Sequence, residues 1–247
     1  MHKHTILHFD SIDSTNAKAS ELATEQKLVE GSVIVTNDQT NGRGMDTNSW
    51  ESESGMNLTM SMVLYPRFLP AGQQFMLSKV ISLGVCKTVS DILPEGRVTI
   101  KWPNDIYIDE QKVAGTLIQN SILGQVLESS IAGIGLNVNQ LVFRSVAPNP
   151  VSLKMITGKE YDLDFILEIL ITNIKFYYEI LKSGRFDELD KFYLSHFYRM
   201  NVVSKFRKEG KIIQARITGV TEYGYLKLES TEGICYECEI KEVEFII

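Results

Sequence analysis

The segment from Lys101 to Leu117 contains the residue types best suited to chemistry on charged reactants. It begins Lys-Trp-Pro-Asn-Asp and places Lys112 seven residues after Asp105, so a turn in a sheet would bring an ammonium and a carboxylate to one end of a hairpin. An enzyme that activates an acid must bring a carboxylate oxygen to the α-phosphorus of ATP while the charges of both are shielded. A fixed lysine and a magnesium-binding aspartate could do this. The same residues would also occur in a hairpin whose lysine and aspartate only form an exposed ion pair and have no chemical role.

A long loop is expected between Asp38 and Met56, because this stretch is rich in Gly, Asn, Ser and Thr and has neither hydrophobic period. Loops of this length in compact domains usually have a function. Gly42 and Gly44 would let the backbone approach a ligand closely, and the guanidinium of Arg43 between them could bind a phosphate or a carboxylate through two parallel hydrogen bonds. Gly-Arg-Gly also occurs in unstructured surface loops, so the segment is weak evidence by itself.

Two further polar segments stand out. Residues 13–16, Asp-Ser-Thr-Asn, are typical of a helix N-cap, and the free donors and hydroxyls of such a cap could also hold a small polar head such as a ureido group. Residues 133–139 read as the end of a strand with two glycines and two asparagines. They lack the third glycine and the following helix of a dinucleotide-binding fingerprint, which argues against a Rossmann fold.

These four segments, in this order and at these separations, resemble the catalytic domain of biotin protein ligases. The resemblance covers about Ile6 to Asn139 by motif, and the rest of the chain fits the usual ending of the family by pattern. It implies an α+β catalytic domain of the class II aminoacyl-tRNA synthetase/biotin synthetase type over residues 1–198. A small SH3-like β-barrel domain is expected over residues 199–247.

The resemblance implies two half-reactions at one site. The biotin carboxylate attacks ATP with loss of pyrophosphate, and an acceptor lysine then attacks the mixed anhydride and expels AMP, without a covalent enzyme intermediate. ATP and Mg²⁺ are implied as substrate and activating ion, with no structural metal. The implied acceptor is a biotin carboxyl carrier domain, and pairing at a sheet edge could dock this partner or support a homodimer. A lipoate ligase or octanoyltransferase, and a non-catalytic biotin-binding module, are the alternatives.

Individual residues match positions of the family's motifs. Those expected to bind biotin are Ser14, Thr15, Asn16, Gln39, Arg43, Gly44, Met45, Lys112 and Gly115. Those expected to bind the nucleotide are Trp50, Lys101, Asn104 and Asn137. The expected catalytic residues are Arg43, Asp105 and Lys112. In the family the lysine contacts the biotin carboxylate and the α-phosphate, and the acidic residue is associated with magnesium and nucleotide.

The chain departs from the family pattern directly after Gly-Arg-Gly. Many members continue with a further arginine or glutamine and then a glycine two residues on, whereas this chain has Met45, Asp46 and Thr47. That region normally helps to retain the reactive adenylate. Because a cation or amide is lost and Asp46 is gained near a phosphate, we expect some biotinyl-AMP to escape.

Hydrophobic periodicity predicts the elements that would position these residues. Alternation predicts strands at 6–12, 33–36, 58–64, 98–102, 106–108, 113–119 and 125–133. Helical spacing predicts helices at 17–25, 77–92, 163–181 and 186–197. We expect a mixed, mainly antiparallel sheet with helices packed on one side. Short β segments at 202–206, 211–220, 225–229 and 234–240 predict the barrel, whose core would be marginal alone.

Composition limits the class of protein. The 247 residues, 44% of them hydrophobic, can bury one sizeable core and a small extra module. The net charge is −6 and no run of lysines or arginines occurs, which argues against DNA as a main partner. No segment has the ~18 consecutive apolar residues of a membrane span, and the N-terminus is too polar for a signal peptide, so a cytoplasmic protein is expected. Only thirteen residues precede Ser14, which leaves no room for the DNA-binding winged helix of some relatives, so we expect an enzyme alone.

The three cysteines do not indicate a disulfide framework. Cys235 and Cys238 form C-x-x-C, but no second ligand pair follows. Residues three apart in a strand point to opposite faces, so we expect two unlinked strand cysteines.

Overall fold

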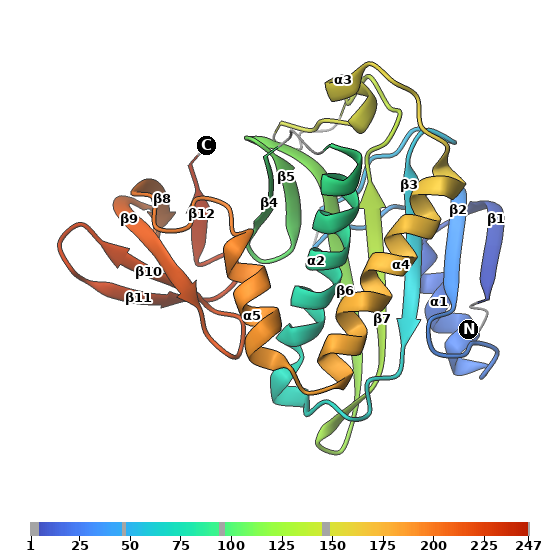
Figure 1. Cartoon of the computed structure of the whole chain (residues 1–247), viewed down its shortest axis with the longest axis horizontal. Helices are drawn as coiled ribbons and strands as arrows, with labels where there is room; N and C mark the ends of the chain where they lie inside the picture. The colour runs from blue at the N-terminus through green and yellow to red at the C-terminus, as the bar shows by residue number, and fades with distance from the viewer. Residues whose placement is uncertain (1–4, 46–47, 94–96, 145–148, 247) are drawn as a thin grey trace.

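The computed structural model describes residues 5–45, 48–93, 97–144 and 149–246. The chain forms two sheets, a seven-stranded sheet in the order β1-β2-β3-β7-β6-β5-β4 and a five-stranded sheet in the order β11-β10-β9-β8-β12 (Figure 1). The first sheet carries most of the predicted site residues. The second, drawn in orange and red, lies at the β4 side of the first.

The seven-stranded sheet is mixed and mainly antiparallel, as predicted. Its strands are β1 (Ile6–Ile12), β2 (Val33–Gln39), β3 (Leu58–Leu64), β4 (Val98–Lys101), β5 (Asp105–Ile108), β6 (Gln111–Leu123) and β7 (Val126–Leu136). Only the β1–β2 pair is parallel among the described strand pairs. The predicted strands are all present, and β6 and β7 are longer than their hydrophobic patterns indicated.

Two long helices cover one face of this sheet. α2 (Phe75–Ile92) and α4 (Leu163–Lys182) lie side by side in front of the strands in Figure 1. They pack closely, because a Cβ added to Gly84 would lie only 2.5 Å from Ile174 Cγ1. The predicted cap of α4 is confirmed, since the Asp162 side chain accepts hydrogen bonds from two backbone N–H groups of the first turn. The helix predicted to stop before Pro94 ends at Ile92; Pro94 itself lies outside the described residues.

The short helix α1 (Thr15–Thr24) packs against the opposite face. Ala19 of α1 contacts a small cluster that includes Ile34, Val63 and Ile131, whereas Val33 and Met62 belong to the core under α2 and α4. Neighbouring residues of a strand point to opposite faces, so β2 and β3 contribute to both layers. The first turn of α1 thereby comes to lie over the middle of the sheet.

The remaining elements are three short helices and the strands of the second sheet. The elements are η1 (Ala71–Gln73), α3 (Leu153–Thr157), α5 (Phe186–Ser195), β8 (Ser204–Lys208), β9 (Lys211–Val220), β10 (Leu226–Ser230), β11 (Cys235–Cys238) and β12 (Val243–Phe245). α3 and β12 were not predicted. The strands of the second sheet are antiparallel, and hydrogen bonding leaves β11 and β12 at its two ends. The predicted fold class is therefore confirmed, with a barrel that is not closed by strand pairing in the described part of the chain.

The second sheet shares the core of the first. Phe206, Ile217 and Leu228 belong to the same buried cluster as α2 and α4. Trp102 Nε1 donates a hydrogen bond of 2.9 Å to the carbonyl of Gly224 in the β9–β10 turn. This agrees with the expectation that the small module needs support from its neighbour. The boundary between residues 198 and 199 stays a prediction.

The expectation for the two strand cysteines can be checked. Cys235 is exposed and Cys238 is buried, so their side chains point to opposite faces as predicted. No cluster of three or more metal-ligating side chains occurs within the described ranges. Among the helices that the structure describes, none is both long enough and apolar enough to cross a membrane.

Candidate active site

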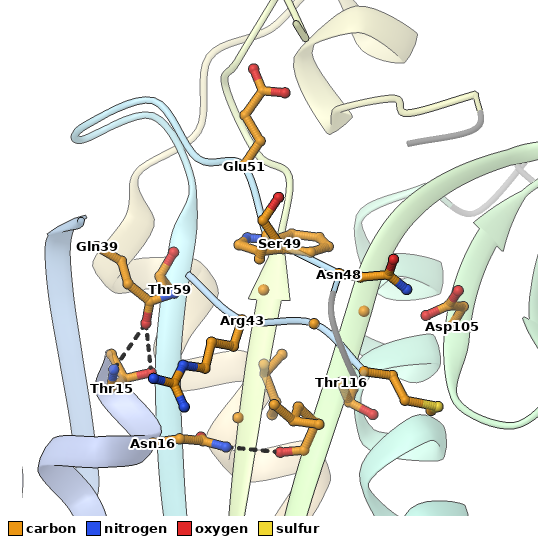
Figure 2. A pocket seen from close by; sticks show the side chains of 18 of the residues that line it. Thr15, Asn16, Gln39, Arg43, Asn48, Ser49, Glu51, Thr59, Asp105 and Thr116 are labelled. Atoms are coloured by element: carbon orange, nitrogen blue, oxygen red, sulfur yellow. Dashed lines mark hydrogen bonds between the residues drawn. The ribbon is translucent and has the colours of Figure 1, made fainter. Parts of the chain in front are cut away.

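The site is a cavity of about 440 Å³ on the α1 face of the large sheet (Figure 2). Strands β3, β6 and β7 supply its floor, and the first turn of α1 supplies one wall. The described part of the loop after β2, the turn before β5 and Asn137, Phe143 and Pro150 after β7 complete the lining. Segments more than a hundred residues apart in the sequence therefore meet around one space.

The cavity collects nearly all of the residues that the sequence singled out. Those that line it are Ser14, Thr15, Asn16, Gln39, Arg43, Gly44, Met45, Trp50, Asn104, Asp105, Lys112, Gly115 and Asn137. Lys101 is not among the lining residues. Asp46 and Thr47 lie outside the described residues, so the departure after Gly44 can be followed only at Met45.

Polar groups are concentrated where α1 begins. Ser14 caps the helix, its Oγ accepting from Ala17 N at 3.4 Å, as the sequence predicted. Thr15 N–H donates to Gln39 Oε1 at 2.9 Å, and Asn16 Nδ2 donates to the carbonyl of Leu117 at 3.1 Å. These bonds tie α1 to β2 and β6, so this end of the cavity presents polar side chains in fixed orientations.

Glycines in β7 let side chains lie directly on the strand backbone. A Cβ at Gly133 would be 2.3 Å from Asn16 Oδ1, and a Cβ at Gly135 would be 2.2 Å from Trp50 Cε2. Both distances are too short for any other residue without movement of its neighbour. The two glycines, noted in the sequence only as a strand end, thus form the floor under α1 and the loop.

The central charged pair is Lys112 and Asp105. Lys112 Nζ lies 2.8 Å from Asp105 Oδ2, and the two side chains are 23% and 28% exposed. Asp105 begins β5 and Lys112 lies near the start of β6, so the hairpin predicted from the sequence brings them together. Both residues line the cavity, so this is not a surface ion pair remote from it.

Arg43 belongs to the other end of the site. In Figure 2 its guanidinium points toward Thr15 and Asn16, away from Asp105. The loop that carries Arg43 is held by backbone hydrogen bonds from Gly44 N to Asn48 O at 2.7 Å and from Trp50 N to Gly42 O at 3.0 Å. The cavity therefore has one cation at its α1 end and a second, Lys112, beside Asp105.

Two buried polar atoms of residues that line the cavity have no partner among the described residues, namely Trp50 Nε1 and Asn137 Oδ1. Asn137 Nδ2 donates to the carbonyl of Val151 at 3.1 Å, which fixes the amide. Buried polar groups are normally paired. A ring that offers both an acceptor and a donor would satisfy this indole N–H and this amide oxygen.

Lys101 points away from the cavity toward the second sheet. Its ammonium donates to Tyr107 Oη at 3.1 Å and lies 5.1 Å from the ring centre of Phe245. Burial lowers the pKa of Lys101. The prediction that Lys101 binds nucleotide receives no support from this placement.

Several lining residues were missed from the sequence, among them Thr59, Thr116, Gln119 and Phe143. Asn57, Thr59 and Ser61 alternate with the apolar residues of their strand, and this alternation predicted only the strand at 58–64. Because these polar residues share the strand face opposite to the apolar residues, they could have indicated a binding site on that face of the sheet.

Comparisons with known proteins agree with this geometry. The sequence profile of the Biotin/lipoate A/B protein ligase family matches residues 8–137. The Bifunctional ligase/repressor BirA of Bacillus subtilis (strain 168) is 29% identical over 241 residues, which is 95% of this chain and 72% of that protein. The Biotin--[acetyl-CoA-carboxylase] ligase of Paracoccus denitrificans is 33% identical over 64% of this chain and 66% of its own length.

A solved structure is similar over nearly the whole chain. The biotin protein ligase from Aquifex aeolicus, determined in complex with biotin and ATP, has a TM-score of 0.82 and 26% identity, and the match covers 98% of each chain. The profile match spans β1 to the end of β7 and includes most of the residues that line the cavity. This chain therefore belongs to the Biotin/lipoate A/B protein ligase family.

Proposed function

We infer that this chain is an ATP-dependent biotin protein ligase, which forms biotinyl-5′-AMP with release of pyrophosphate and then transfers biotin to a lysine of a carrier domain. The observation that carries this conclusion is the single cavity in which the Lys112–Asp105 pair, Arg43 and the polar start of α1 meet. The Aquifex aeolicus relative, solved with biotin and ATP, supports the choice of substrates.

In the first half-reaction two anions must meet, the biotin carboxylate and the α-phosphate. Lys112 is held beside the cavity by Asp105 and is exposed enough for its remaining N–H groups to reach a ligand. A preorganised ammonium at this point lowers the repulsion between the reactants and stabilises charge on the phosphate in both steps. Arg43 would close the loop over the bound ligands through charge-assisted hydrogen bonds.

The substrate heads are assigned to the two ends of the cavity. Ser14, Thr15, Asn16 and Gln39 offer the fixed donors and acceptors that a ureido group needs. The opposite end has the indole of Trp50 and the unpartnered Asn137 Oδ1, which suit the flat face and the amino edge of adenine. The carboxylate tail of biotin would then reach Lys112 between them.

Magnesium is proposed to bind at Asp105. Mg²⁺ usually takes one or two carboxylates and completes its octahedron with phosphate oxygens and water, so a single aspartate is a sufficient protein ligand. The ion pair with Lys112 uses Oδ2 of Asp105, which leaves Oδ1 for the ion. Bound there, Mg²⁺ would neutralise phosphate charge during activation.

The acceptor is proposed to be a biotin carboxyl carrier domain, because the Paracoccus denitrificans relative is named for acetyl-CoA carboxylase. Among the described residues β5 pairs with β6 only as far as Ala114, and the carbonyls of Thr116 and Leu117 accept hydrogen bonds from Asn104 and Asn16. A carrier or a second copy of this chain could therefore pair along residues 118–123 of β6. We propose a cytoplasmic enzyme with no role for DNA, in line with the polar N-terminus and the net charge of −6.

Two assays test the proposal. Pyrophosphate exchange into ATP should depend on biotin and should not occur with lipoate or octanoate. Transfer of labelled biotin to a carrier domain should require both ATP and Mg²⁺. If exchange is faster with lipoate than with biotin, the protein is a lipoate ligase and the proposed substrate is wrong. If the protein binds biotin but releases no pyrophosphate, it is a non-catalytic biotin-binding module.

A further inference from the structure

Ser61 of β3 contacts the polar start of α1 from beneath it. Its side chain is fully buried, at 0% exposure, and does not line the cavity. Ser61 Oγ lies 2.6 Å from Asn16 Oδ1 and 2.8 Å from Thr15 Oγ1. One buried hydroxyl therefore contacts two of the polar residues at the start of α1 that line the site.

The direction of each hydrogen bond in this network follows from the chemistry of the groups. Asn16 must direct Nδ2 toward the carbonyl of Leu117, because a carbonyl can only accept, and Oδ1 of the same amide is then an acceptor toward Ser61. Ser61 has a single hydroxyl proton, which it must donate to Asn16 Oδ1.

The proton of Thr15 is fixed in turn. At 2.8 Å the contact between Thr15 Oγ1 and Ser61 Oγ needs a proton, and Ser61 has none left to give. Thr15 therefore donates to Ser61, and the longer contact of 3.3 Å from Thr15 Oγ1 to Gln39 Oε1 is secondary. With its proton directed into the protein, the Thr15 hydroxyl presents only lone pairs to the cavity.

We propose that Ser61 is a positioning residue for biotin binding. By fixing the direction of this hydrogen-bond chain, Ser61 makes the Thr15 hydroxyl an acceptor for a ureido N–H of biotin. The inference rests on the proposed function. A cyclic urea has an N–H on each side of its carbonyl, and a hydroxyl held as an acceptor can accept a hydrogen bond from one of them. A freely rotating hydroxyl would be oriented to accept this bond only part of the time. Ser61 acts through Thr15 and touches no substrate atom.

The test is a double-mutant cycle of S61A and T15V, with S82A as the matched control. Ser82 is also a fully buried serine, but it lies in α2 under the other face of the sheet and its hydroxyl has no partner among the described residues. S61A should raise KM for biotin and the calorimetric Kd about tenfold, the scale of one oriented hydrogen bond, while kcat and KM for ATP stay within about twofold. T15V should raise KM for biotin to a similar extent.

The double variant should be no worse than T15V alone, because Ser61 acts on biotin through Thr15 and the Asn16 amide is still held by its bond to the Leu117 carbonyl. Additive effects of S61A and T15V, a change of S61A within about twofold, or an equal rise in KM for biotin in S82A would overturn the inference. If S61A does not fold, S61C replaces it, since a thiol of similar size is only a weak donor. A wild type without biotin-dependent exchange would instead refute the proposed function, so the two failures are distinguishable.

Discussion

The indole of Trp50 lies so close to the backbone of Gly135 that a single added carbon there would be 2.2 Å from Trp50 Cε2. Trp50 comes from the loop after β2, and Gly135 lies near the end of β7. The glycine therefore determines whether the loop can bring its tryptophan onto the sheet. If the indole covers the adenine, nucleotide binding depends on the absence of a side chain at Gly135, because that absence lets the loop place Trp50 on the sheet.

Gly135→Ala should therefore displace the indole and raise KM for ATP about tenfold or more. This is the scale expected when the stacking of the indole on the adenine is lost and the loop that carries Trp50 is displaced. KM for ATP in the exchange assay and the fluorescence of Trp50 would measure the change. Gly72→Ala is the control, because the nearest atom to its added Cβ is 3.9 Å away. If KM for ATP is unchanged in Gly135→Ala, Trp50 does not contribute to nucleotide binding.

Lys112→Ala should slow turnover by roughly 10²-fold or more, which is the usual effect of removing one oriented donor to developing charge. Asp105 would also lose its partner inside the cavity, so substrate anions would meet an unpaired carboxylate. Single-turnover formation of biotinyl-AMP would measure the first step directly. Lys154→Ala, which removes a lysine of an ion pair with the exposed Glu160, should have no such effect. Near-normal turnover of the Lys112 variant would exclude this lysine from the mechanism.

The elements of the large sheet could be predicted because they depend on local pattern. Alternating apolar residues mark 58–64 as a strand, and helical spacing with a good N-cap at Asp162 marks α4. The hairpin that joins Asp105 to Lys112 was predicted for the same reason, since both residues and the turn lie within one short segment.

Features that depend on distant segments could not be predicted. The short helix α3 and the three-residue strand β12 have too few residues to show a period. Ser61 contacts Thr15, which is 46 residues earlier in the chain, and no spacing in the sequence indicates such a pair. Lys101 was assigned with its motif, but its direction depends on Phe245 at the far end of the chain.

Lys101→Met tests that direction. The ammonium lies between Tyr107 and Phe245 and not in the lining of the cavity, so KM for ATP should stay within about twofold of the wild-type value. The comparison variant is Asn104→Ala, which changes a lining residue of the same motif and should raise KM. A tenfold or larger rise for Lys101→Met would restore this lysine as a nucleotide-binding residue and would require its side chain to turn toward the cavity.

Met45 lines the cavity directly after Arg43 and Gly44, at the position where the family pattern that the sequence resembles has an additional arginine or glutamine. A thioether cannot form the charge-assisted hydrogen bonds by which a guanidinium holds a phosphate. The described residues that line the cavity include only Arg43 and Lys112 as cations, and Lys112 is partly neutralised by Asp105. The wild-type enzyme should therefore release biotinyl-AMP faster than a relative with Gly-Arg-Gly-Arg.

Met45→Arg should slow this release about tenfold or more, because a charge-assisted bond to the phosphate contributes on the order of 1.5 to 3 kcal/mol. Filter binding of labelled adenylate, with a chase of unlabelled biotin and ATP, gives the dissociation rate. Met155→Arg, at an exposed position of α3, controls for added charge alone. Transfer to the carrier should continue in both variants, since the acceptor lysine attacks the adenylate while it is bound. If wild type and Met45→Arg release the adenylate at the same rate, the loop retains it without a second cation, and the departure from the family pattern has no effect on leakage.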